Sequence, residues 1–325
     1  MRLLLTGGAG FIGSHLAEQL ALRGDEVAVL DNLDPGYDVA IKRRNLDRLR
    51  GRCHVVEGDV LDPELLDRLL GGRPLAAVIH LAALAGVRRS VQEPWRYQRV
   101  NVEGTARLAH AMAEHGVRRL VFASSSSVYG DGLPPPYRET DPAVVPASPY
   151  AASKRAAELV LHAMHRVRGL SVCVLRYFTV FGPRQRPGMA IREFCQAALR
   201  GEPITMFGDG ESSRDYTYID DAVAGTMAAL DRAPEGLSTY NLGSGRPVRL
   251  GELIERIGRA VGTDLRVARA PMPAADVSHT LACIDAAARD LGYRPATSFD
   301  EGLRRFVAWL RQDGQSDCCP GTSRT

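Results

Sequence analysis

Short apolar runs of strand length alternate with amphipathic segments of helix length over the first 180 residues of the chain. Strands are expected at Arg2–Thr6, Glu26–Leu30, Cys53–Glu57, Ala76–Leu81, Arg119–Ala123 and Ser171–Arg176. Helices are expected near Phe11–Arg23, Pro63–Leu70, Pro94–His115 and Pro149–Val167. Alternating strands and helices form right-handed βαβ units, in which helices cover both faces of a parallel sheet. The sequence therefore predicts an α/β fold with a doubly wound parallel sheet.

A glycine-rich turn, Thr6–Gly13, separates the first predicted strand from the first predicted helix. Its G-x-x-G-x-x-G spacing permits a tight turn and close approach to a pyrophosphate, and the following helix N-terminus favours negative charge. Asp31 ends the second predicted strand, where a carboxylate binds the adenosine ribose and repels a 2′-phosphate. These features predict a Rossmann sheet that binds NAD. Asp59, after the third predicted strand, is expected either to reach the adenine edge or to cap a turn.

Tyr150 and Lys154 stand one helical turn apart in the segment that begins at Pro149. A nearby ammonium lowers the pKa of a phenol, so the tyrosine can exchange a proton with a sugar hydroxyl while a hydride leaves the same carbon. The fifth predicted strand ends in the run Ser124–Ser127, at the sheet edge where ligands bind. One of these serines is expected to bind the reacting hydroxyl, although a serine there can also simply cap the strand.

The alternation changes near Phe181, where Gly, Pro and Arg gather in residues 182–188. Shorter elements follow, with helices expected near Ala190–Arg200, Ile219–Leu230, Leu250–Val261 and Phe299–Arg311, and strands near Ser238–Leu242 and Leu265–Ala270. We expect residues 1–180 to form the NAD-binding Rossmann domain, with segments returning from the C-terminal half. Residues 181–313 are expected to form a smaller mixed α/β cap that binds substrate. Residues 314–325 are polar and are expected to be a disordered tail.

Composition excludes several other classes of protein. With 41 basic and 38 acidic residues among 325, the net charge of +3 gives no reason to expect a nucleic-acid or membrane partner. The six cysteines form no C-x-x-C pair, and no metal site is expected; Cys318 and Cys319 fall in the polar tail. No signal peptide or membrane span is visible, so a cytoplasmic protein is expected. Only Lys42 and Lys154 are lysines, which draws attention to both positions.

Together these residues resemble the extended short-chain dehydrogenase/reductase family, specifically its nucleotide-sugar epimerases and dehydratases. The resemblance runs from Met1 to about Arg311, and its further marks are His80–Ala83, Asn101–Thr105, Val128–Gly130 and Arg214–Asp221. It implies that NAD is held tightly and takes a hydride from carbon 4 of the sugar. Tyr150 and Lys154 serve this oxidation, with Ser125 as the hydroxyl partner of the tyrosine. The hydride then returns to the opposite face of the sugar. The implied NAD contacts are Gly7, Gly10, Phe11, Ile12, Gly13, Asp31, Asn32, Asp59, Val60, Leu81, Ala82, Ala83, Asn101, Tyr150 and Lys154. The resemblance also implies a homodimer formed through the helices near Pro94–His115 and Pro149–Val167.

Ser126 and Ser127 narrow the reaction that the resemblance implies. The family's 4,6-dehydratases carry an Asp-Glu pair there, and its UDP-glucuronate decarboxylases a glutamate, whereas serine performs no acid–base chemistry at neutral pH. Residues 31–46 and 176–190 resemble the family's UDP-glucuronate 4-epimerases, although Gly188 replaces their usual aspartate. UDP-glucose 4-epimerases typically have asparagine at Thr179. The expected activity is therefore 4-epimerisation of a UDP-sugar, foremost UDP-glucuronate to UDP-galacturonate, with the uronate carboxylate bound by Ser126, Ser127, Thr179 and Arg186.

The resemblance also places residues around the rest of the UDP-sugar. Arg88 is expected to donate to the substrate, Arg214 to pair with the diphosphate, and Asp276 to hold the uridine ribose. Met206 and Phe207 are expected to wall the uracil or, equally, to be ordinary core residues. Three alternative functions stay open: a UDP-glucose or UDP-N-acetylglucosamine 4-epimerase, a UDP-glucuronate decarboxylase or other dehydratase, and a non-catalytic NAD sensor.

Overall fold

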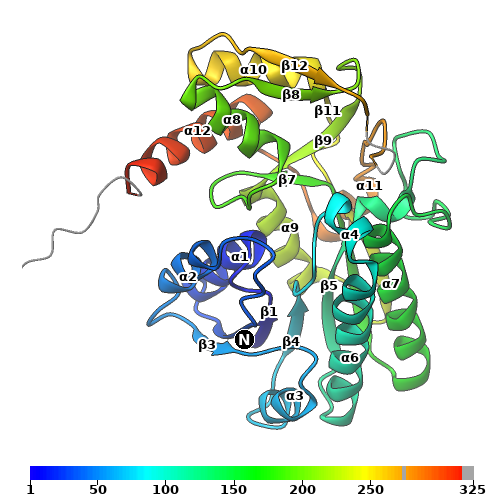
Figure 1. The fold of residues 1–325 in the computed structure, drawn as a ribbon. Helices are drawn as coiled ribbons and strands as arrows, with labels where there is room; N and C mark the ends of the chain where they lie inside the picture. Colours follow the sequence, from blue (N-terminus) through cyan, green and yellow to red (C-terminus); the bar gives the residue numbers. More distant parts are fainter. Residues whose placement is uncertain (273–275, 317–325) are drawn as a thin grey trace, which may run out of the picture.

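A seven-stranded parallel sheet forms the centre of the computed structural model, which describes residues 1–272 and 276–316 (Figure 1). Every neighbouring pair of strands in it is parallel. From edge to edge, the strands are β10 (Leu237–Leu242), β6 (Ser171–Tyr177), β5 (Arg119–Ser125), β4 (Ala77–His80), β1 (Arg2–Thr6), β2 (Glu26–Asp31) and β3 (His54–Glu57). The prediction of a doubly wound parallel sheet is confirmed.

Helices cover both faces of this sheet because successive side chains of each strand point in opposite directions. In β1, Leu3 and Leu5 join the core formed with α1 (Phe11–Leu22) and α9 (Ile219–Arg232). Leu4 joins the opposite core, formed with α3 (Pro63–Leu70), α6 (Gly104–Glu114) and α7 (Pro149–Arg168). The near-continuous apolar strands seen in the sequence are thus buried from both sides.

The C-terminal half returns to this sheet. The strand expected at Ser238–Leu242 is β10, whose Tyr240 lies opposite Leu175 at the sheet edge. Helix α9 packs on α1, and α11 (Asp285–Leu291) contributes Ala287 and Leu291 to the same core. The local sequence pattern predicts a strand here but does not indicate which strand it pairs with. The sequence alone therefore did not show that β10 joins the main sheet beside β6.

The remaining elements lie beyond the carboxyl ends of the strands, at the top of Figure 1. A two-stranded parallel sheet pairs β8 (Ile204–Phe207) with β12 (Val267–Ala270), and helices α8 (Ala190–Arg200), α10 (Leu250–Val261) and α12 (Phe299–Ser316) pack beside it. A three-stranded sheet joins β11 (Pro247–Arg249), β9 (Ser213–Tyr218) and β7 (Thr179–Phe181). Helix α12 continues past the expected start of the tail at residue 314. Residues 317–325, with Cys318 and Cys319, lie outside the described residues.

The long helix expected at Pro94–His115 consists of three parts. It begins as α5 (Pro94–Tyr97), widens into the π-helical segment η1 (Gln98–Glu103) and continues as α6. Shorter elements that the sequence did not predict are α2 (Val39–Asp47), α4 (Val87–Gln92) and the 3₁₀ turn η2 (Ser126–Tyr129). Such short elements depend on tertiary contacts more than on periodicity.

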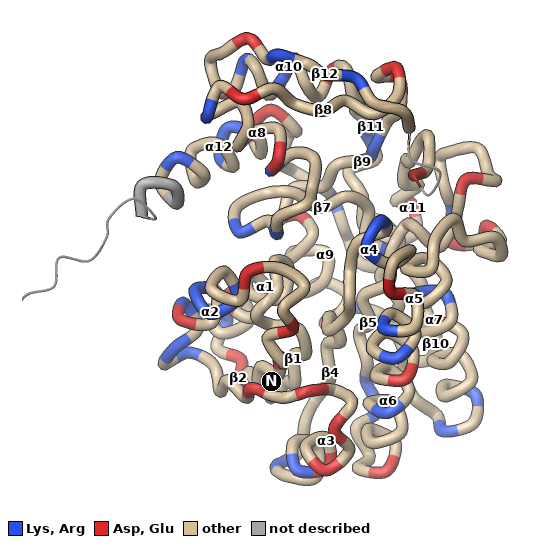
Figure 2. Tube along the Cα trace, in the orientation of Figure 1, with Lys and Arg blue, Asp and Glu red and all other residues tan. Residues whose placement is uncertain are grey.

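Charged residues of both signs are spread over the elements in Figure 2. Among residues 1–272 and 276–316, no helix combines the length and the apolar character needed to cross a bilayer. The same residues contain no group of three or more His, Cys, Asp or Glu side chains arranged to hold a metal ion.

Candidate active site

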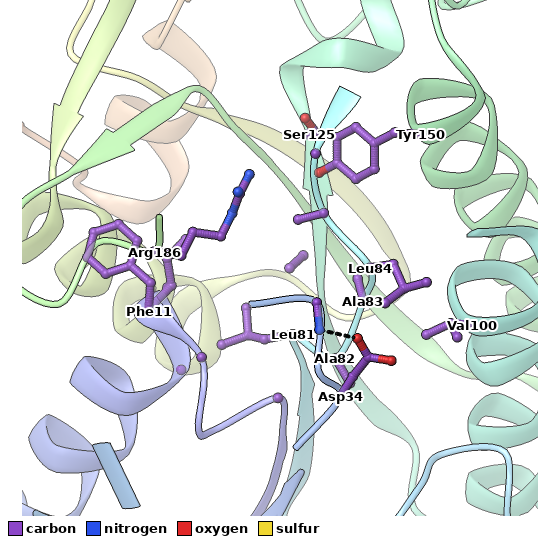
Figure 3. Close-up of a pocket in the computed structure, with 18 of the residues that line it drawn as sticks. Phe11, Asp34, Leu81, Ala82, Ala83, Leu84, Val100, Ser125, Tyr150 and Arg186 are labelled. Atoms are coloured by element: carbon purple, nitrogen blue, oxygen red, sulfur yellow. Dashed lines mark hydrogen bonds between the residues drawn. The ribbon is translucent and has the colours of Figure 1, made fainter. Parts of the chain in front are cut away.

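A cavity of about 460 Å³ opens at the carboxyl ends of β1, β2, β4 and β5 (Figure 3). This edge of the sheet is where ligands bind in doubly wound folds. Every residue predicted to contact NAD lines the cavity except Asn101: Gly7, Gly10, Phe11, Ile12, Gly13, Asp31, Asn32, Asp59, Val60, Leu81, Ala82, Ala83, Tyr150 and Lys154. The sequence pattern and the fold therefore identify the same site.

The turn between β1 and α1 requires glycine for lack of space. Gly7 has φ +76°, and a Cβ there would lie 2.6 Å from the backbone nitrogen of Ala82. A Cβ on Gly13 would lie 2.2 Å from the Gly7 carbonyl oxygen. Helix α1 starts after Gly10, and no side chain caps its first turn. The N–H groups of that turn therefore remain available to an anion at the cavity wall, as a dinucleotide pyrophosphate requires.

Asp31 is buried and its carboxylate is fixed from two sides. It accepts hydrogen bonds from the backbone N–H of Ala9 at 3.0 Å and of Leu33 at 2.9 Å. Lys42 Nζ lies 3.6 Å from the same carboxylate and 5.3 Å from the centre of the Tyr37 ring. Lys42 lines the cavity but was not among the predicted contacts. The only feature of the sequence that pointed to Lys42 was that it is one of two lysines in the chain.

Asn32 and Asp59 close the adenosine end of the cavity together. Asn32 Nδ2 donates to Asp59 Oδ2 at 2.8 Å, while Asp59 Oδ1 accepts from the backbone N–H of Leu61 at 2.9 Å. Asp59 thus caps a turn, as one of its two expectations requires, and it also lines the cavity; contact with the adenine edge stays a prediction.

Asn101 holds the cavity wall from behind and does not line it. It is 1% exposed and lies in the π-helical segment η1. Its side chain accepts from Leu84 N at 2.7 Å and donates to Leu84 O at 3.0 Å and to Ser153 Oγ at 2.9 Å. The amide of Asn101 thus bonds to both backbone groups of the cavity residue Leu84, and direct contact with the cofactor stays a prediction.

Ser125 and Tyr150 bring two hydroxyl groups together at the end of β5 and the start of α7 (Figure 3). Ser125 Oγ donates to Ser127 Oγ at 3.0 Å, and the Tyr150 ring packs edge-to-face on Tyr97 at 6.2 Å between centres. Burial raises the pKa of Tyr150, while a hydrogen bond with Ser125 and the charge of Arg186 lower it. Tyr97 was not predicted; its hydroxyl donates to the carbonyls of Ala85 and Gly86 in the cavity wall.

Lys154 occupies a more enclosed position than expected. It is 3% exposed, and its Nζ lies 4.5 Å from the centre of the Phe122 ring. Burial lowers the pKa of Lys154 to about 7, while the charge of Glu158 raises it. The charge of Arg186 also lowers the pKa of Tyr150. Helical spacing could not indicate this influence, because Arg186 comes from a distant segment.

The four residues predicted to bind the substrate carboxylate, Ser126, Ser127, Thr179 and Arg186, all line the cavity. The Arg186 guanidinium donates to the Pro187 carbonyl at 3.1 Å and forms no ion pair with the residues that the structure describes. Gly188 has φ +80°, and its N–H donates to Glu193 at 2.8 Å. Gly188 stands where the family usually has aspartate, and its backbone N–H, bonded to Glu193, fixes the loop at this position.

The other predicted substrate residues lie outside this cavity. Arg88 pairs with Asp276 at 3.2 Å and stacks over Phe207 at 4.3 Å, so these three form one cluster between α4 and β8. Arg214 donates to the carbonyls of Ser213 and Ser278. Met206 is 5% exposed and belongs to the hydrophobic core, which agrees with the second of the two expectations for it. Side-chain pairing and core packing hold these residues in this structure, and motif spacing shows neither.

A model of the NAD dependent epimerase/dehydratase family matches residues 3–243. A UDP-glucuronate 4-epimerase of Thermodesulfobacterium geofontis is 40% identical over 313 residues, which cover 95% of this chain and 96% of that protein. UDP-glucuronate 4-epimerase 4 of Arabidopsis thaliana is 40% identical over 324 residues, covering 94% of this chain and 74% of the relative.

Solved structures show the same similarity. The UDP-glucuronic acid 4-epimerase from Bacillus cereus, in complex with UDP-glucuronic acid and NAD, has a TM-score of 0.90 and 32% identity, covering 96% of this chain and 99% of that one. The UDP-glucose 4-epimerase from Thermotoga maritima with UDP-glucose has a TM-score of 0.90 and 34% identity, with the same coverage. The match extends over both the central sheet and the elements beyond its carboxyl edge.

Proposed function

The chain belongs to the NAD dependent epimerase/dehydratase family, and from that premise we propose that it interconverts UDP-glucuronate and UDP-galacturonate. One observation supports this reaction above others. The cavity presents the Ser125–Tyr150 hydroxyl pair beside four hydrogen-bond donors, and the two positions after Ser125 carry hydroxyls instead of carboxylates. Such a site can move a proton at one carbon and hold a substrate carboxylate, but it lacks the acid and base that elimination needs.

NAD⁺, when bound, accepts a hydride from carbon 4 of the sugar and returns it to the opposite face. The residues of the chain move the proton and hold the sugar. Tyr150 takes the proton of the 4-hydroxyl and later returns it, and Ser125 donates to the same oxygen. Arg186 favours the phenolate of Tyr150 by its positive charge. In this proposal Lys154, which is buried and lines the same cavity, binds the cofactor ribose through its ammonium group.

Retention of the carboxylate is the distinctive demand of this substrate. The 4-keto sugar is a β-keto acid, which loses CO₂ when the breaking bond aligns with the carbonyl π system. Ser126, Ser127 and Thr179 offer neutral hydroxyl donors, and Arg186 offers a charged one. Donors of fixed direction can hold the carboxylate in an orientation that opposes this alignment.

UDP-glucose is the second candidate substrate, because the Thermotoga maritima neighbour is a UDP-glucose 4-epimerase and hydroxyl donors also suit a hydroxymethyl group. Incubation of the purified protein with UDP-glucuronate, without added NAD, and observation by proton NMR separates the possibilities. UDP-galacturonate supports the proposal, a UDP-pentose indicates decarboxylation, and turnover of UDP-glucose alone favours the second candidate. Tyr150→Phe is expected to lose turnover by at least about a hundredfold while retaining NAD, as removal of an acid–base group does.

For the nucleotide we propose that Arg88, Phe207, Arg214 and Asp276 bind UDP. Arg88 stacks on Phe207 and pairs with Asp276, so a base entering this cluster can replace the guanidinium on the ring. Asp276→Ala is expected to raise the KM for UDP-glucuronate with little change in kcat, measured by initial rates. An unchanged KM would place the uridine elsewhere.

We also propose a homodimer formed through α6 and α7. The two helices pack side by side, and α7 leaves Leu159 52% exposed. Leu159→Arg is expected to yield monomers in light scattering after gel filtration, whereas an unchanged mass would exclude this face. A cytoplasmic location is likewise proposed; the free thiols of Cys53, Cys173, Cys195 and Cys283 suit a reducing compartment, and cell fractionation checks it.

A further inference from the structure

Glu158 lies outside the cavity, one helical turn beyond Lys154 on α7. It is 1% exposed, and four hydrogen bonds converge on its carboxylate. Ser124 Oγ donates to Oε1 at 2.5 Å, and Arg176 Nε donates to the same oxygen at 3.0 Å. Arg176 Nη2 and Arg155 Nη1 donate to Oε2 at 2.9 and 2.8 Å. Burying a carboxylate is costly, and this one is compensated by charged donors on both oxygens.

The donors belong to the elements that carry the reacting groups. Ser124 precedes Ser125 at the end of β5, and Arg176 stands opposite Ser124 in the neighbouring strand β6. Glu158 shares a helix face with Tyr150 and Lys154. One carboxylate therefore joins the strand that ends in Ser125 to the helix that begins at Tyr150, and so fixes their separation.

The negative charge of the Glu158 carboxylate also raises the pKa of Lys154, against the effect of burial. The other charged or titratable groups around the pair are Tyr150, Arg155 and His162 on α7, Arg176 on β6, His80 on β4 and Tyr129 on η2. Burial lowers the pKa of His80 to about 3 and that of His162 below its usual value, and raises that of Tyr129 to about 12. These three therefore stay neutral around pH 7–8, and the guanidinium groups stay charged. Lys154, with its pKa lowered to about 7, is the member of the group that changes charge there.

We propose that Glu158 is a positioning residue for Tyr150 and Lys154. From the same face of α7, one turn beyond Lys154, its carboxylate favours the ammonium form of Lys154, and its hydrogen bond to Ser124 holds the Ser124–Ser125 strand end against α7. The proposal rests on the proposed function, because a fixed ammonium matters to turnover only if Tyr150 exchanges a proton with substrate. Glu158 touches neither substrate nor cofactor site and acts through Lys154 and Ser124.

The lysine content of the chain makes this proposal directly measurable. Lys42 and Lys154 are the only lysines, so protein labelled with ¹³C at lysine Cε gives two lysine signals, and Lys42→Arg assigns them. A pH titration of the NAD-loaded protein then follows the midpoint of Lys154. Glu158→Gln is expected to lower this midpoint by about one pH unit or more, because an opposite charge is lost, and Glu158→Asp to restore most of it.

Arg155→Gln is the matched control variant, and it should shift the titration midpoint of Lys154 in the opposite direction. Its side chain is 24% exposed, so its loss is easier to accommodate, and it removes a positive charge that offsets Glu158. The Lys154 midpoint should therefore rise. An unchanged midpoint in both variants overturns the proposal, and if Glu158→Gln does not fold, an unchanged midpoint in Arg155→Gln is sufficient to do so.

Turnover supplies the second readout. The kcat of Glu158→Gln near pH 8 should fall about tenfold or more with a KM close to wild type, since the change affects the reacting pair and not the bound sugar. A loss of thermal stability with both kcat and the Lys154 midpoint unchanged would assign Glu158 a purely structural role. If wild-type protein does not turn over UDP-glucuronate, the proposed function fails alone, because the lysine titration requires no substrate.

Discussion

We expect Asp31 to decide which dinucleotide the site accepts, because a carboxylate at the end of the second strand of a Rossmann sheet repels a 2′-phosphate. Backbone N–H groups of Ala9 and Leu33 fix both carboxylate oxygens. We expect Asp31→Asn to weaken NAD binding about tenfold, as the loss of a charged hydrogen-bond acceptor does, and to raise the NADP-to-NAD preference. Calorimetric titration of cofactor-stripped protein measures both. Asp38→Asn, which caps α2 without lining the cavity, is the control; equal losses in the two variants would contradict the assignment.

We expect Arg186 to affect the reaction through its charge, and the direction of the effect follows from its influence on Tyr150. Its positive charge lowers the pKa of Tyr150, so Arg186→Gln raises that pKa and leaves less phenolate at any given pH. Because burial raises the pKa of Tyr150 above its usual value near 10, both enzymes hold little phenolate between about pH 7 and 9. The ratio of wild-type to variant kcat in a stopped NMR assay should therefore be above one and constant over that range, and should fall towards one only where both phenols ionise. Arg186→Lys, which keeps the charge, should give a ratio close to one, and a ratio of one for Arg186→Gln would exclude this role.

At the scale of elements, the π-helical segment η1 directs the Asn101 side chain toward Leu84 in the cavity wall. Its amide satisfies both the N–H and the carbonyl of Leu84. Asn101→Ala leaves these buried groups unpaired and should cost about 1–3 kcal/mol of unfolding free energy. Chemical denaturation measures the loss, and NAD retention should fall with it because Leu84 lines the cavity. Gln98→Ala, on the exposed side of the same segment, should change stability by less than about 0.5 kcal/mol; a similar loss in both variants would contradict the argument.

The elements also show where sequence reasoning succeeds and where it stops. The glycine turn, Asp31 and the Tyr150–Lys154 pair were predictable because their spacing is set by local geometry and by the ligand. The widening at η1 was not, since a single π-helical turn inside an α-helix interrupts the apolar pattern too briefly to be recognised from sequence. The position of β10 in the main sheet was also not predictable, because the sequence pattern of a strand does not indicate which strand it pairs with. The charge of Arg186, a predicted substrate contact, also lowers the pKa of Tyr150, an influence that sequence separation conceals.

At the scale of the whole molecule, the cavity lies between the central sheet and the segments beyond its carboxyl edge, so contacts across that boundary hold the site together. The segment 182–189 carries Arg186 and follows β7. Arg184, in this segment, is buried and bonds to Glu18 at 2.9 Å and to His15 at 3.0 Å, both on α1. The helix expected to meet the cofactor pyrophosphate is thereby joined to the loop proposed to meet the substrate.

Loss of this partly buried bridge should therefore affect both ligands. Arg184→Ala removes the buried guanidinium from Glu18, whose side chain is 25% exposed, and should cost about 2 kcal/mol of unfolding free energy, as the loss of a hydrogen bond to a charged group does. Arg52 pairs with the same Glu18 from the exposed side at 3.7 Å, so Arg52→Ala should cost less than about 1 kcal/mol. Denaturation measures the two costs, and the KM for UDP-glucuronate reports on the position of Arg186. Equal stability losses, or an Arg184→Ala protein with an unchanged KM, would mean that the loop keeps its place without α1.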